Sequence, residues 1–158
     1  MTDARFEDGE AGPLNLVARD ADDLGIISAL VQDAVLTGAD LTWKRGQRRF
    51  ACLLNRFRWE DQSAAEAAKR PYERVRALLV IEDALVVRSQ GIDRGDPETV
   101  MSILSLTWEP GEDGTGRVTL VLAGDGAVMV EVEALEVTLH DVTKPYVAPS
   151  RKKPVHRD

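Results

Sequence analysis

The sequence predicts an α+β domain that is mainly antiparallel β, with seven or eight strands and one amphipathic helix near the N-terminus. Two observations lead to this fold class. Apolar residues recur at spacings of three and four over residues 20–36, which is typical of a helix. From residue 40 onward the apolar residues mostly alternate with polar ones, and glycine-rich turns interrupt the runs. A chain of 158 residues is long enough to bury one core without cross-links.

The first predicted elements are a short strand over residues 13–18 and a helix over residues 20–36. Asp20 is a typical N-cap, and acidic residues follow it in the first turn, where the helix dipole favours them. The helix is expected to end at Thr37-Gly38. The apolar positions that define its buried face are Leu24, Ile27, Leu30, Val31 and Ala34.

The predicted strands follow one another through short turns, which favours a meander. Such a chain folds as a curled barrel or as two packed sheets, and a pleckstrin-like barrel is one form that fits. Residues 61–70 are rich in Ala and Glu and form either one or two helical turns or a loose connection. The predicted strands cover residues 41–44, 48–59, 72–81, 84–90, 99–108, 117–123, 128–133 and 135–140.

The ends of the chain differ in composition from its middle. Residues 1–12 are polar, and residues 149–158 are basic and contain proline, so both are predicted to be disordered around a single domain over residues 13–148. No apolar run reaches the roughly 20 residues that cross a bilayer. Cys52 is the one cysteine and lies in an apolar run, which predicts an inert core thiol and a reduced, cytoplasmic setting with no membrane association.

Charge is distributed unevenly along the chain. The net charge of −7 argues against a protein that coats nucleic acid. Residues 41–76, however, hold ten basic and four acidic side chains, which leaves +6 in this segment and −13 over the rest. Five of the eight aromatic residues lie in the same segment. This segment is therefore the candidate functional region.

The sequence Asn55–Trp59 alternates between polar and aromatic residues. In a strand, this alternation places Arg56 and Arg58 on the face opposite to the aromatic side chains. If this strand pairs with residues 72–81, two further arginines come to lie beside them. The predicted anion-binding or interface residues are Arg56, Arg58, Arg74, Arg76, Trp43 and Asn55.

Four neighbouring guanidinium groups repel one another unless carboxylates or a bound anion compensate them. The compensating negative charge can come from carboxylates of this chain, from a second copy in a homodimer, or from a phosphate-bearing partner. The leading hypothesis is a non-enzymatic interaction module that binds itself or an anionic surface. One alternative is a small-molecule or enzymatic pocket near Trp43, Asn55 and Arg56. Another is binding to nucleic acid or to a phosphorylated ligand.

No combination of residues in the sequence predicts catalysis, a cofactor or a metal. His140 and His156 are not at metal-ligand spacing from another His or Cys. His140 and Asp141 are neighbours in a predicted strand and so face opposite ways. The acidic loop over residues 111–116 lacks the ligand spacing of a calcium loop.

Several short strings along the chain carry a resemblance: Leu41-Thr42-Trp43, Arg48-Arg49-Phe50-Ala51, Leu54-Asn55-Arg56-Phe57-Arg58-Trp59-Glu60, Glu73-Arg74-Val75-Arg76, Gly91-Ile92-Asp93, and the segment from Val118-Thr119-Leu120 through Glu131-Val132-Glu133. They are similar to the landmarks of an alphaproteobacterial family of small single-domain proteins of unknown function. The resemblance covers roughly residues 14–147 and implies a bacterial, cytoplasmic protein, but it brings no activity, ligand or functional residue with it.

Overall fold

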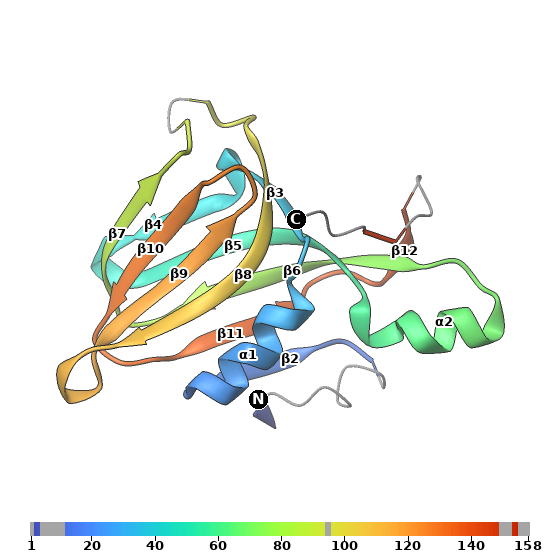
Figure 1. Ribbon diagram of the computed structural model, residues 1–158, viewed down its shortest axis with the longest axis horizontal. Coiled ribbons are helices and arrows are strands. Elements are labelled where there is room, and N and C mark those ends of the chain that lie inside the picture. The colour runs from blue at the N-terminus through green and yellow to red at the C-terminus, as the bar shows by residue number, and fades with distance from the viewer. Residues whose placement is uncertain (1, 4–11, 94–95, 149–152, 155–158) are drawn as a thin grey trace.

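A computed structural model describes residues 2–3, 12–93, 96–148 and 153–154 (Figure 1). Its fold is α+β and mainly antiparallel, as the sequence predicts. The strands are β1 (Thr2–Asp3), β2 (Asn15–Ala18), β3 (Val35–Thr37), β4 (Leu41–Lys44), β5 (Arg49–Phe57), β6 (Glu73–Ile81), β7 (Ala84–Gln90), β8 (Val100–Pro110), β9 (Gly116–Leu122), β10 (Ala127–Val132), β11 (Val137–Asp141) and β12 (Tyr146–Val147). The helices are α1 (Ala21–Leu30) and α2 (Gln62–Ala68), with single helical turns η2 (Gly38–Asp40), η3 (Arg45–Gln47), η4 (Trp59–Asp61) and η5 (Glu112–Gly114).

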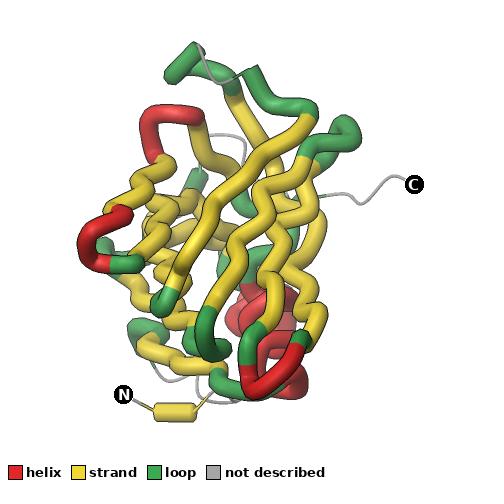
Figure 2. The backbone as a smooth tube through the Cα atoms, turned by 90° about the vertical axis from the view of Figure 1, so that its left-hand side faces the viewer, coloured by secondary structure: helices red, strands yellow, loops and turns green. Residues whose placement is uncertain are grey.

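The strands form one strongly curled sheet in the order β1-β2-β11-β6-β5-β3-β8-β9-β10-β7, with β4 beside β5 and β12 beside β6. The curl brings β7, at the end of this order, opposite β4 (Figure 1). These two strands do not pair with each other, so the sheet stays open between them. The side view shows a molecule made mostly of strand, with loops at both ends of the curled sheet (Figure 2).

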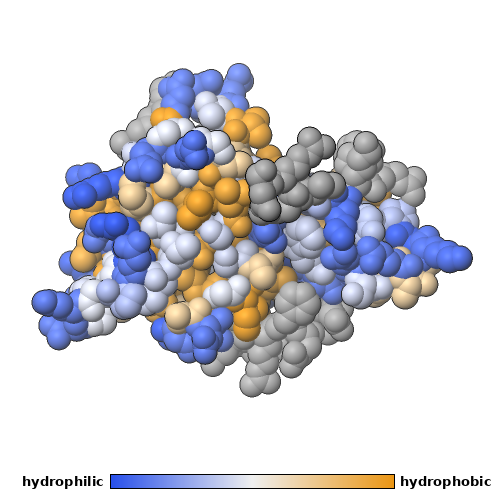
Figure 3. All heavy atoms as spheres, in the orientation of Figure 1, coloured by the Kyte–Doolittle hydropathy of each residue, from blue (hydrophilic) through white to orange (hydrophobic). Residues whose placement is uncertain are grey.

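Helix α1 packs against β8 and β2 and covers one side of the core. Its first turn is as predicted, because the Asp20 side chain accepts a hydrogen bond of 2.8 Å from the backbone N–H of Asp23. Ile27 and Leu30 are fully buried. On the surface seen in Figure 3, apolar residues gather over the middle of the molecule, and hydrophilic residues lie mainly at its periphery.

The predicted end of the first helix is wrong. The helix ends at Leu30, and Asp33 takes a left-handed conformation with φ of 62°. Ile103 of β8 then exchanges backbone hydrogen bonds with Asp33 and Ala34, of 2.7 and 2.9 Å, and the chain continues as strand β3. Val31 and Ala34 are buried core residues outside the helix, so their spacing imitates a longer helical face.

The predicted hairpin of residues 41–59 is present, with Trp43 opposite Phe50 in the β4–β5 pair. The strands do not form the meander that the sequence favours, because the consecutive strands β6 and β7 do not pair with each other. Strand β6 pairs with β5, β11 and β12, whereas β7 pairs with β10. The turn between β6 and β7 contains Asp83 in a left-handed conformation with φ of 55°. It directs the chain from one half of the sheet to the other instead of forming a hairpin.

Most of the two segments predicted to be disordered, 1–12 and 149–158, lies outside the described residues. Within the first segment, Thr2 and Asp3 pair in parallel with Leu16 and Val17 of β2. None of the described helices combines the length and the apolar character that crossing a bilayer requires.

Cys52 provides a test of how the core packs. Its side chain is fully buried on the inner side of β5, and burial raises the pKa of the thiol well above its ordinary value. We therefore expect iodoacetamide to alkylate native protein at pH 8 only at the rate of unfolding, and to alkylate protein in urea at once. Mass spectrometry over time measures this. Rapid alkylation of the native protein would contradict the packing described here.

Candidate functional site

The six residues predicted to form one site lie in three separate places. The first place is buried on the inner side of β5, and we call it the ionic cluster. The second is the opposite side of β5 and β6, which we call the outer face. The third is the opening between β4 and β7, which we call the slot. The ionic cluster contains Arg56 and Arg58, the outer face contains Asn55, Arg74 and Arg76, and the slot contains Trp43.

Arg56 is the centre of the ionic cluster and is completely buried. Its Nη1 and Nη2 donate to the carboxylate of Glu60 at 2.8 and 2.7 Å. Its Nε and Nη2 donate to Asp141 at 3.1 and 3.0 Å, and Nη1 also reaches the carbonyl of Phe57 at 3.4 Å. Burial lowers the pKa of Arg56, but the two carboxylates raise it by more than burial lowers it. The pKa of Arg56 therefore lies above its ordinary value. Arg56 therefore stays charged and has no free donor for a ligand.

Arg58 continues the ionic cluster toward the surface. Its Nη1 donates to Glu73 at 2.6 Å, and its guanidinium also lies 3.6 Å from both Glu60 and Asp61. Asp61 is held in turn by Arg70 through two hydrogen bonds of 2.6 and 2.7 Å. The Arg70 hydrogen bonds lower the pKa of the Asp61 carboxyl. Arg58 is only 9% exposed, so it is part of the internal network and not of a recognition surface.

The four arginines therefore do not share one exposed face, and this part of the sequence prediction is corrected. In the β5–β6 pair, Arg56 lies opposite Val75, and Phe57 lies opposite Arg74. Residues that pair directly point to the same side of a sheet, so Arg74 belongs to the side of Phe57 and not to that of Arg56. Within each strand, the side chains alternate between the two faces as the sequence predicts. The register between the strands, which decides which faces coincide, differs by one residue from the one assumed.

The outer face holds the remaining two arginines. The Arg74 Nη1 donates weakly, at 3.3 Å, to the carbonyl and to the side-chain oxygen of Asn55. The Asn55 amide donates in turn to the hydroxyl of Tyr146 at 2.5 Å. Burial lowers the pKa of Arg74, and the opposite effects of Tyr146 and Asp33 do not offset this desolvation. Arg76 is two residues further along β6 on the same side and is exposed.

Arg74 and Arg76 differ from most arginines of the described chain in having no acidic partner within 4 Å. Two other described arginines, Arg45 and Arg88, also lack an ion pair, but they lie in the turn η3 and on β7. The arginines that do form ion pairs are Arg19, Arg48, Arg49, Arg56, Arg58, Arg70 and Arg117.

A shallow groove of about 660 Å³ continues the outer face along β6. Its floor includes Ala51, Leu78 and Val80, which are apolar. Two ion pairs stand at its rim, Arg49 with Glu82 at 2.7 Å and Arg19 with Glu136 at 3.1 Å. Lys44 also lines the groove, and no ion pair holds it among the described residues. The outer face thus combines apolar floor with unpaired cations.

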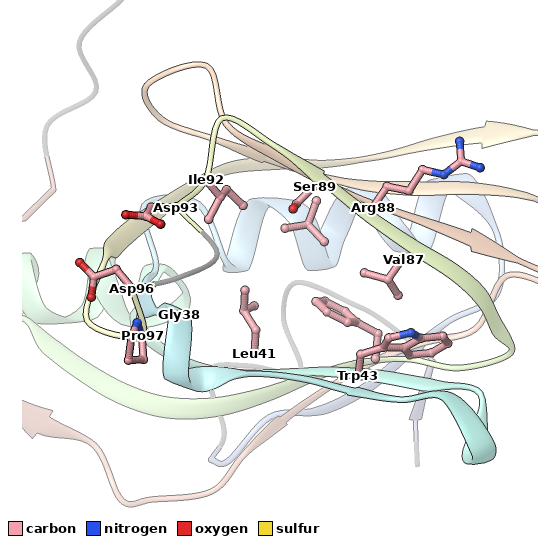
Figure 4. Close-up of a pocket in the computed structure, with 12 residues that line it drawn as sticks. Gly38, Leu41, Trp43, Val87, Arg88, Ser89, Ile92, Asp93, Asp96 and Pro97 are labelled. Atoms are coloured by element: carbon pink, nitrogen blue, oxygen red, sulfur yellow. The ribbon is translucent and has the colours of Figure 1, made fainter.

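The slot is a second cavity, of about 270 Å³, on the inner side of β4 (Figure 4). Trp43 and Leu41 form one wall, and Val87 and Ser89 of β7 form the other. The sequence indicates Trp43 as a candidate residue but does not indicate its neighbours on β7. The sequence shows that Val87 and Ser89 lie on one side of a strand and Arg88 on the other. No local signal shows that the curl of the sheet brings this strand, β7, opposite β4.

Asn55 and Arg56, which the sequence analysis placed with Trp43 in a possible pocket, do not line the slot. Within the described part of the chain, no group of three or more His, Cys, Asp or Glu side chains is arranged to hold a metal ion. The groove on the outer face and the slot on the inner side are therefore the candidate sites.

Comparison with known proteins gives one match. A family model described as "Protein of unknown function (DUF2948)" matches residues 14–156. No curated protein and no solved structure matches the chain. The match covers slightly more of the chain than the resemblance found in the sequence, and it assigns no residue a role.

The ionic cluster predicts a large difference between two arginine variants. Arg56→Ala leaves Asp141 buried without a counter-charge and leaves Glu60 with only the more distant Arg58, at 3.6 Å, so we expect it to lower the free energy of unfolding by about 3–5 kcal/mol. Arg48→Ala breaks the exposed pair with Glu133 and should cost less than about 1 kcal/mol. Urea unfolding followed by fluorescence measures both. Equal losses in the two variants would show that Arg56 is not buried in this network.

Proposed function

The chain belongs to the DUF2948 family of proteins of unknown function, and from its outer face we propose that it is an interaction module that binds an acidic surface of a partner protein. This proposal keeps the class of function predicted from the sequence but changes the residues. Arg74 and Arg76 remain as recognising cations, Lys44 is added, and Arg56 and Arg58 are left out.

The observation that carries the proposal is that no carboxylate of the described residues lies within 4 Å of Arg74, although the more distant Asp33 acts on its charge. Arg74 is partly buried, and only the neutral oxygen atoms of Asn55 accept its hydrogen bonds. A desolvated guanidinium without a carboxylate gains more from an incoming carboxylate than an exposed one, because it has already lost much of its water. Asn55 and Tyr146 hold each other at 2.5 Å and fix the surroundings of this group. The site is thus arranged before a partner arrives.

The charge of the outer face supports a partner of opposite sign. Arg74 and Arg76 together with the charged side chains of the groove comprise five cations and two carboxylates. Both carboxylates, Glu82 and Glu136, already pair with arginines. Two copies that met face to face would therefore bring like charges together, which disfavours the homodimer proposed from the sequence through this face. An acidic partner protein satisfies the same cations without repulsion.

The shape of the outer face supports a protein partner. The apolar floor formed by Ala51, Leu78 and Val80 provides contact area between the cationic groups. Protein interfaces commonly combine such an apolar centre with a charged rim that steers the approach. Binding to nucleic acid by base stacking has less support, since Phe57 is only 1% exposed and the Trp59 indole donates to the carbonyl of Gln32 at 2.9 Å.

Paired charge reversals test the proposal. We expect Arg74→Glu with Arg76→Glu to weaken binding of a short synthetic peptide of alternating glutamate and leucine by at least about tenfold, because two attractions become repulsions. The matched control is Arg88→Glu with Arg117→Glu, which changes the net charge equally on the other half of the sheet. The control should bind as the unaltered protein does. NMR titration gives both the affinity and the residues that respond.

Three results would overturn the proposal. One is equal weakening in the two double variants, which would mean that only net charge matters. Another is tighter binding of single-stranded DNA or of anionic lipid vesicles than of the acidic peptide at the same salt concentration. The third is a titration in which the shifts fall outside β5 and β6. Light scattering on the unaltered protein tests the homodimer separately.

A further inference from the structure

The slot is an opening between β4 and β7 in the curled sheet, and backbone hydrogen bonds close it at both ends. At its narrow end, the backbone N–H of Ala84 donates to the carbonyl of Arg48 at 2.8 Å and joins β7 to the β4–β5 turn. At its wide end, the loop after β7 is tied to η2, because Gly38 and Ala39 donate to the carbonyls of Thr99 and Pro97 at 3.1 and 2.9 Å. The edges of β4 and β7 separate between these two points (Figure 4). An extended chain therefore cannot run through the slot without breaking one of the ties.

The interior of the slot is apolar. Six apolar side chains line it from five different segments, and two of them, Phe50 and Val128, are almost fully buried and form the floor. The others are partly buried, pack against the core and line the cavity. The apolar lining consists of Leu41, Trp43, Phe50, Val87, Ile92 and Val128.

The polar groups of the slot are few and lie at its margin. Ser89 lies on the same side of β7 as Val87, and no hydrogen bond holds its hydroxyl among the described residues. The guanidinium of Arg88 points away from the slot, and the side chains of Asp93 and Asp96 lie at the wide end (Figure 4). Among the described lining residues, a bound anion would thus meet carboxylates and no cation directed into the slot, and burying its charge against apolar walls is unfavourable.

From these features we propose that the slot binds a small uncharged molecule that is mainly apolar and carries one hydroxyl or similar hydrogen-bonding group. The volume of about 270 Å³ sets the size. An apolar cavity of about 150 Å³ already holds benzene, so the slot accommodates a single substituted ring or a short branched aliphatic molecule. The ring contacts Trp43 and Val87, and the polar group bonds to the Ser89 hydroxyl.

This site is independent of the outer face. Side chains alternate along β4, so Trp43 faces the slot whereas Thr42 and Lys44 line the groove on the opposite side. A failure of the acidic-partner proposal leaves the slot proposal unaffected, and the reverse also holds.

Phenol, toluene and benzoate serve as probes, since they share a ring and differ in the polar group. We expect phenol to bind at least about tenfold more tightly than benzoate, and about fivefold more tightly than toluene through the bond to Ser89. Ser89→Ala should remove the advantage of phenol over toluene. Trp43 fluorescence reports the binding, and Trp43→Phe shows which part of the signal comes from this residue and not from Trp59 or Trp108.

Filling the slot gives the second test. Val87→Phe places a ring in the cavity and should weaken phenol binding by at least about tenfold, while Val86→Phe adds the same ring to an exposed neighbouring position and should leave binding unchanged. Ile92→Phe fills the slot from the loop if Val87→Phe does not fold, and circular dichroism verifies the fold of each variant. Unchanged phenol affinity in a folded filled variant, equal weakening in Val86→Phe, or preference for benzoate would overturn the proposal.

Discussion

The buried charge of Arg56 is the constraint on which the rest of the structure depends. Its side chain leaves the inner side of β5 and reaches Glu60 in η4 and Asp141 in β11. Asp141 also accepts a hydrogen bond of 3.0 Å from the backbone N–H of Leu14, just before β2. One guanidinium thus connects four segments from both ends of the chain. All five of its N–H groups have an acceptor, which is the condition under which such a buried ion is tolerated.

This constraint also decides which arginines are available for recognition. Since Arg56 points inward and its neighbour Arg58 bonds to Glu73, the positive charge of β5 is compensated within the chain. Strand β6 is held in a register that places Arg74 and Arg76 on the other side, where Asn55 offers only neutral oxygen atoms. The proposal of an outer-face interaction site is based on this difference between arginines that are paired within the chain and arginines that are not.

The fold class could be predicted because periodicity of apolar residues is a local signal. The alternation along β5 and the cap at Asp20 each involve residues that are only a few positions apart in the sequence, and the structure confirms both. The end of α1 could not be predicted, because Val31 and Ala34 are buried by β8 and not by continuing the helix. Their spacing alone does not distinguish the two cases.

The candidate site could be predicted only in part, for a related reason. The sequence identifies Arg74, Arg76, Asn55 and Trp43 as unusual, but their division between two sides of the sheet follows from strand register, which depends on residues far apart in the chain. The contact of Arg56 with Asp141 joins positions 85 residues apart, and no local pattern indicates it. The slot depends on the curl of the whole sheet, so the sequence offered Trp43 without the opposite wall.

The separation of buried and available arginines is the central claim, and hydrogen exchange of the arginine Nε–H groups measures it most directly. In a two-dimensional NMR spectrum recorded after transfer to deuterated solvent, we expect the Arg56 Nε–H signal to persist long after those of Arg74 and Arg76 have disappeared. Exchange of Arg56 as fast as that of Arg76 would contradict the account, since it would mean that the buried network does not form.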